Sequence, residues 1–70
     1  MIIFTDHALK RMRGRKVTKT QVAATIKNPE IEIIESGGVK LLRKKFKDKS
    51  LEVAIESGKN KIIVITLYWV

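Results

Sequence analysis

Hydrophobic residues recur at two different spacings along the chain, and the change between them comes at Pro29. Before Pro29 the apolar residues lie three or four positions apart, a spacing that places them on one side of a helix. After Pro29 they recur at every second position, which is typical of strands with one buried face. A short apolar run at residues 2–4 precedes the first helical pattern. The chain is therefore predicted to form one strand, two helices and four further strands.

Both helices are predicted within the first 28 residues. The first begins after Thr5, a good N-cap residue, and ends near Gly14. The second begins with a capping box formed by Thr18 and Gln21. It ends near Lys27, because the proline two residues later disfavours helical geometry at the residue before it. The apolar positions predicted to be buried in these helices are Ala8, Leu9, Met12, Val22, Ala23 and Ile26.

Turns rich in glycine, serine and asparagine separate the four later strands. These strands are predicted at about residues 31–34, 39–46, 51–56 and 62–69. The third alternates cleanly and is expected to have one buried face, whereas the last is apolar on both faces, as a central strand is. The predicted architecture is a single domain over residues 1–70 with an α+β fold of order β-α-α-β-β-β-β. Two helices pack on one face of a mostly antiparallel twisted sheet.

The other face of this sheet is predicted to be open, and the alternation does not decide which residues of strand 39–46 it carries. The two alternatives are Leu41, Arg43 and Lys45, or Lys40, Leu42, Lys44 and Phe46. Both sets contain cations, so the open face is expected to be basic in either case.

Composition excludes several classes of site. The chain has no cysteine, which excludes a disulfide framework, a thiol nucleophile and a thiolate metal site. It has one histidine, so no histidine cluster exists, and neither a metal nor another cofactor is expected. The longest apolar run is about half the length of a membrane span. These features predict a cytoplasmic protein without membrane contacts.

Charge changes the picture further, because 15 Lys and Arg against 7 Asp and Glu give a formal net charge of +8. The cations concentrate in two blocks, residues 10–19 and 40–49, separated by an acidic segment. Charge of this size favours polyanions, with nucleic acid first. A uniformly solvated surface does not require the cations to concentrate in two blocks, whereas a binding groove lined by both blocks does. The alternative is adaptation to heat, in which Lys-rich surfaces are common.

His7 and Arg11 are four residues apart and are predicted to share a helix face, which Arg15 would extend. An imidazole shuttles protons near neutral pH, and a guanidinium holds phosphoryl oxygens in a bidentate grip. This pair is therefore suited to phosphate chemistry. The alternative is that His7 is a surface or capping residue in the first helical turn.

Cations and aromatic residues in the strands supply further candidates. Arg43, Lys44 and Lys45 are interpreted either as a strand that contacts phosphates or as an edge strand whose lysines prevent pairing. Tyr68 and Trp69 end the last strand on opposite faces. Each ring is interpreted either as part of the core or as a surface on which a base stacks. The phenol of Tyr68 has the further alternative of transferring a proton.

The opening Asp6-His7-Ala8-Leu9-Lys10-Arg11-Met12-Arg13-Gly14-Arg15 has the form H-A-x-x-R-M-x-x-R. Val17-Thr18, Asn28-Pro29 and the closing Ile65-Thr66-Leu67-Tyr68-Trp69 complete the pattern. It resembles a family of small uncharacterised prokaryotic domains related to the RelE/ParE and BrnT toxins. The resemblance implies a RelE-like fold and a toxin of a toxin–antitoxin system. Such a toxin cuts RNA without metal, often on the ribosome, and is held by an acidic antitoxin.

The resemblance places His7, Arg11 and Arg15 at motif positions. The superfamily's habit of using basic strand residues and a late aromatic nominates four further residues, Arg43, Lys44, Lys45 and Tyr68. The predicted catalytic residues are His7, Arg11 and Tyr68. The predicted nucleic-acid-binding residues are Lys10, Arg13, Arg15, Lys16, Arg43, Lys44 and Lys45. The alternatives are a non-catalytic nucleic-acid-binding module and a protein-interaction domain, including a homodimer. Convergence of both basic blocks on one cleft is expected.

Overall fold

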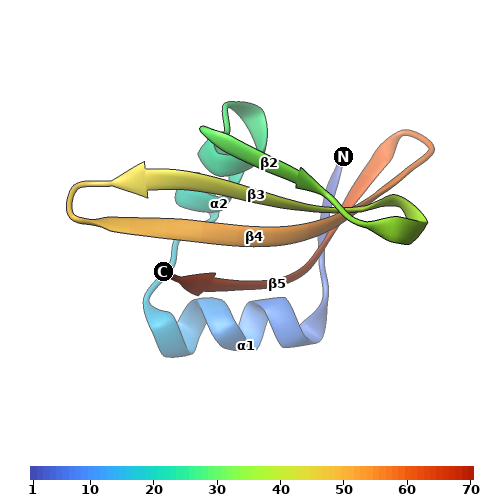
Figure 1. Ribbon diagram of the computed structural model, residues 1–70. Coiled ribbons are helices and arrows are strands. Elements are labelled where there is room, and N and C mark those ends of the chain that lie inside the picture. The colour runs from blue at the N-terminus through green and yellow to red at the C-terminus, as the bar shows by residue number, and fades with distance from the viewer.

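Two helices and a five-stranded sheet make up the computed structural model, which describes residues 1–70 (Figure 1). The elements are β1 (Ile2–Phe4), α1 (Asp6–Arg15), α2 (Lys19–Lys27), β2 (Ile31–Ile34), β3 (Val39–Phe46), β4 (Lys49–Gly58) and β5 (Lys61–Trp69). The strand order is β1-β5-β4-β3-β2, with β1 parallel to β5 and the other pairs antiparallel. The predicted α+β fold and its order of elements are confirmed.

Local signals place the helix ends. The Thr5 side chain accepts a hydrogen bond from the backbone N–H of Ala8 at 3.0 Å and caps α1. At α2 the backbone of Gln21 donates to the Thr18 side chain, and the Gln21 side chain accepts from the Thr18 backbone, so the capping box is confirmed. The predicted end of α1 at Gly14 is slightly early. The left-handed residue after the helix is Lys16, with φ of 56°, and its N–H closes the last turn.

Both helices contribute to one apolar core. Figure 1 shows α2 behind the sheet and α1 running alongside β5. The core residues are Ala8, Met12, Val17, Val22, Leu42, Leu51, Val53, Ile55, Val64 and Leu67. The expected burial of Ala23 is wrong, because it is exposed and Thr25 is buried instead. The Thr25 hydroxyl donates to the backbone carbonyl of Gln21 at 2.8 Å, which satisfies it inside the core.

The middle of the sheet is β4, which the alternating pattern did not predict. All residues from Leu51 to Ile55 are buried, including Glu52 at 5% exposure. Side chains of Arg43 on β3 and Tyr68 on β5 contact Glu52 on the open face, and the expectation of one exposed face is wrong for this segment. β5 is flanked by strands on both sides only where β1 pairs with it, at Ile62–Val64. Beyond that point α1 lies along its edge, and the Trp69 indole N–H donates to the Arg15 carbonyl at 2.9 Å.

The two faces of β3 are now assigned. Leu42 and Phe46 pack in or against the core on the helix-covered face. Because side chains alternate along a strand, Arg43 lies on the open face, where it contacts Glu52 of β4. The first of the two alternatives, with Leu41, Arg43 and Lys45 on the open face, is therefore the one the structure adopts.

Candidate functional site

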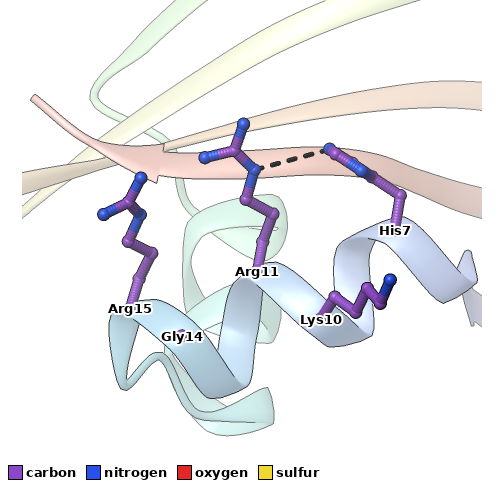
Figure 2. A pocket seen from close by; sticks show the side chains of 5 residues that line it. All are labelled: His7, Lys10, Arg11, Gly14 and Arg15. Carbon is purple, nitrogen blue, oxygen red and sulfur yellow. Dashed lines mark hydrogen bonds between the residues drawn. The ribbon is translucent and has the colours of Figure 1, made fainter.

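One side of α1 carries a row of three side chains with four-residue spacing. His7, Arg11 and Arg15 rise from the helix in the same direction, toward β5 (Figure 2). With Lys10 and Gly14 they line an open pocket of about 300 Å³ that contains no acidic residue. Four residues of helix advance about 6 Å, so the three side chains present positive or proton-accepting groups at regular intervals. The pocket is suited to an anion with several oxygen atoms.

The imidazole of His7 is held by two contacts. Its Nε2 lies 3.1 Å from the hydroxyl of Thr66 on β5 and accepts a hydrogen bond from Nε of Arg11 at 3.5 Å. Because a guanidinium N–H only donates, Nε2 carries a lone pair in this arrangement and the proton of the neutral ring is on Nδ1. Nε2 has a single lone pair, and Arg11 and Thr66 both contact it, so a ligand reaches it by displacing one of them; His7 is exposed, which leaves room for this exchange. The predicted sharing of one face by His7 and Arg11 is confirmed.

Thr66 is a site residue that sequence reasoning did not identify. It is 59 positions from His7 in the chain and comes close only through the fold. A register irregularity between Ala54 and Ile55 sets the phase of this half of β5, so that Thr66 pairs with Ala54 and Tyr68 with Glu52. No local signal in the sequence marks that irregularity.

A second polar cluster occupies the open face of the sheet. Arg43 donates to one oxygen of the Glu52 carboxylate, from Nε at 3.0 Å and Nη2 at 2.7 Å, and the Tyr68 hydroxyl donates to the other oxygen. Burial of Glu52 by itself raises its pKa, but the hydrogen bonds from Tyr68 and Arg43 and the Arg43 charge outweigh burial. The pKa of Glu52 therefore lies below its ordinary value.

The pKa of Tyr68 is raised, first by its hydrogen bond to Glu52, then by burial and by the negative charge of that carboxylate. Tyr68 thus keeps its proton and acts as a donor. The charge of Arg43 is matched by a buried carboxylate, and Glu52 is a polar residue whose role sequence reasoning did not foresee. The three residues are direct neighbours across β3, β4 and β5.

The remaining predicted binding residues are dispersed. Lys44 donates from Nζ to the backbone carbonyl of Asn28 at 3.2 Å, on the helix-covered side. Lys45 is exposed. Arg13 lines a different depression on α1, together with Asp6, Leu9 and Lys10. Lys16 is the exposed residue that follows α1.

The expectation that both basic blocks converge on one cleft is wrong. No residue of 40–49 lines the α1 pocket, which is formed by α1 alone. The physical reason is the strand geometry of the second block, since alternation sends consecutive cations to opposite faces of the sheet.

Two classes of feature are absent from residues 1–70. No group of three or more acidic, histidine or cysteine side chains is placed to hold a metal ion. No helix has both the length and the apolar character that crossing a membrane requires.

One protein family matches the chain over residues 4–69, and its description is a domain of unknown function, DUF4258. No curated protein and no solved structure matches the chain. The resemblance to RelE/ParE and BrnT toxins therefore stays a prediction. Because the family match covers both helices and nearly the entire sheet, the chain belongs to the DUF4258 family.

Proposed function

We propose that the protein is a metal-independent endoribonuclease that acts on RNA phosphodiesters at the α1 pocket, as the toxin of a toxin–antitoxin system. The observation that carries this proposal is the exposed imidazole of His7 beside Arg11, in a pocket without acidic residues. Cleavage of RNA without a metal requires a general base and cationic groups that stabilise the transition state, and His7 and its neighbouring arginines supply both. The resemblance of the His7 to Arg15 segment to RelE-like toxins supports the same reaction.

The chemistry uses the ribose 2′-hydroxyl as the nucleophile. Nε2 of His7 takes the 2′-hydroxyl proton while that oxygen forms a bond to phosphorus, and the bond from phosphorus to the 5′ oxygen breaks. The products are a 2′,3′-cyclic phosphate and a 5′-hydroxyl end. Arg11 and Arg15 stabilise the negative charge that gathers on the phosphoryl oxygens in the transition state.

The leaving 5′ oxygen needs a proton, and Tyr68 is assigned to deliver it. The phenol carries its proton at neutral pH and donates it to Glu52 in this structure, so the proposed step requires the hydroxyl to turn from Glu52 to the leaving oxygen. Tyr68 is two residues beyond Thr66 on the same face of β5, about 7 Å along the strand.

The decisive experiment measures cleavage of a labelled single-stranded RNA by the purified protein in the presence of a chelator. Cleavage with cyclic-phosphate ends is expected, and His7→Ala is expected to slow it about 100-fold or more. Lys59→Ala is the matched control, because Lys59 is exposed in the turn between β4 and β5. Equal rates for His7→Ala and the control would remove His7 from the reaction.

The toxin role adds a partner and a cellular readout. Expression of the protein alone should arrest growth and cleave cellular RNA, on or off the ribosome, and His7→Ala should relieve both effects. Co-expression of an acidic antitoxin should restore growth and retain the protein in a complex. Growth arrest that persists in His7→Ala would contradict the toxin mechanism.

A second candidate is a nucleic-acid-binding module without catalysis. It is favoured by the contacts of Tyr68 and Arg43 with Glu52, which hold two of the nominated groups away from a ligand. This candidate predicts RNA binding that weakens steeply with salt. It also predicts that no products form after long incubation, so the same purified protein and RNA distinguish the two candidates.

A further inference from the structure

A second open pocket, of about 370 Å³, lies where β3 and β5 end and β4 begins, near the start of α2. Its lining residues are Gln21, Phe46, Lys47, Asp48, Lys49 and Trp69. None of them lines the α1 pocket, and none was assigned to RNA by the proposed function. The pocket combines two aromatic rings with charged side chains of both signs.

The two rings are rigidly placed. Phe46 and Trp69 pack edge to face, with ring centroids 6.5 Å apart and an interplanar angle of 87°. The indole N–H of Trp69 donates to the Arg15 carbonyl, which fixes the orientation of the ring. The ring is nevertheless only partly buried, and the exposed side chain of Lys49 places Nζ 5.2 Å from its centroid. One face of Trp69 is therefore within reach of a solvent-borne group.

The polar residues around this face offer different bonding capacities. Lys47 and Lys49 are exposed cations in and beside the β3–β4 turn, and Asp48 between them only accepts hydrogen bonds when ionised. Gln21 uses its side-chain oxygen to cap α2, and its amide N–H groups donate to no other residue. The pocket thus offers a stacking surface, cations, one acceptor and one donor.

We propose that this pocket binds a nucleobase of single-stranded RNA, with guanine preferred. In the proposed complex the base stacks on Trp69 in the place of the Lys49 ammonium group, and Lys47 and Lys49 contact the flanking phosphates. Asp48 accepts from the adjacent N–H groups of guanine, and the amide of Gln21 donates to its carbonyl oxygen. A simple phosphate needs no aromatic ring, and a paired base presents no free face to stack.

Arg15 connects this pocket to the α1 pocket. Its side chain lines the α1 pocket, while its backbone carbonyl accepts the Trp69 hydrogen bond. The choice of RNA as the ligand rests on the proposed function, whereas the pocket itself is built from other residues.

The test uses the fluorescence of Trp69, the only tryptophan in the chain. The probe is a short guanine-containing oligoribonucleotide with 2′-O-methyl riboses, which bind but are not cleaved. Saturable quenching is expected with this single strand, and at least 5-fold weaker binding with an abasic strand of the same length. Equal quenching by the abasic strand, or no quenching in low salt, would overturn the proposal.

Variants separate base recognition from general charge. Asp48→Asn should reduce the preference for guanine over adenine, expected at about 5-fold or more, to near unity. Lys47→Ala should weaken binding at least 2-fold relative to Lys59→Ala, a matched loss of charge at the opposite turn. An unchanged guanine preference in Asp48→Asn, or equal affinities for the two lysine variants, would count against the pocket.

His7→Ala distinguishes failure of this proposal from failure of the proposed function. Quenching by the uncleavable strand should persist in His7→Ala, because His7 is not part of this pocket. Quenching without cleavage of ordinary RNA would refute the endoribonuclease and keep the base site. Cleavage without quenching would do the reverse.

Discussion

Two basic segments of similar composition behave differently in this protein. In α1, the four-residue spacing of His7, Arg11 and Arg15 brings the side chains to one face and one pocket. In β3, Arg43 contacts Glu52 on the open face of the sheet. Its neighbour Lys44 lies on the helix-covered face and donates to the backbone carbonyl of Asn28, just after α2. A helix therefore brings cations to one face when they are spaced four residues apart. A strand sends consecutive cations to opposite faces of the sheet.

The segments also differ in how their charge is balanced. No acidic residue lines the α1 pocket, so its cations are available to an anionic ligand. The guanidinium of Arg43 is matched by the buried Glu52 carboxylate, which also accepts from Tyr68. Positive charge in α1 is thus suited to binding, whereas the charge of Arg43 contributes to the stability of the sheet.

The largest expected effect is on stability, from Glu52→Ala. The substitution leaves Arg43 and Tyr68 without their partner and should lower the free energy of unfolding by about 2 kcal/mol. Arg11→Ala, at a half-buried position without an acidic partner, should change it by less, about 0.5 kcal/mol. Denaturant unfolding of both variants measures the difference. Equal losses would mean that the two segments do not divide their roles as described.

An intermediate effect is expected on RNA affinity, from Arg15→Ala compared with Lys44→Ala. Loss of Arg15 should weaken binding of a single strand several-fold. It should also reduce the magnitude of the slope of log K against log salt concentration by about 0.7. Lys44→Ala should leave both unchanged, because Lys44 is directed to the Asn28 carbonyl. Titrations at three salt concentrations provide the measurement. A matching decrease in Lys44→Ala would show that the β3 cations also contact RNA.

The smallest expected effect is the pH dependence of stability contributed by the Arg43–Glu52–Tyr68 cluster. The pKa of Glu52 is lower in the folded protein than its ordinary value of 4.5, so its contribution is present above that value and is lost as pH falls below it. The pKa of Tyr68 is raised above 10.0, so its contribution is lost as pH rises beyond that value.

Arg43 is 37% exposed, and water therefore screens the pair and limits the size of this effect. Unfolding curves of the unaltered protein and Glu52→Gln, recorded between pH 3 and 7, should approach each other as pH falls. A constant difference between the two across that range would show that ionisation of Glu52 does not stabilise the fold.

Most of the fold was predictable because its signals are local. The Thr18 capping box, the Thr5 cap and the period change at Pro29 depend on residues within a few positions of one another. The His7–Arg11 pair was predictable for the same reason, since four positions on a helix always share a face. Burial of Ala23 was predicted wrongly because the rotation of α2 on the sheet is set by packing, not by the helix itself.

The sequence alone determined the order of the elements, the start of each helix and which side of α1 carries His7 and Arg11, because short-range hydrogen bonds and side-chain periods decide these features. Only the tertiary structure decided that Thr66 meets His7 and that Glu52 is buried between Arg43 and Tyr68. These contacts depend on strand order and on the register irregularity between β4 and β5. Both are properties of pairings between distant segments, which no local pattern encodes.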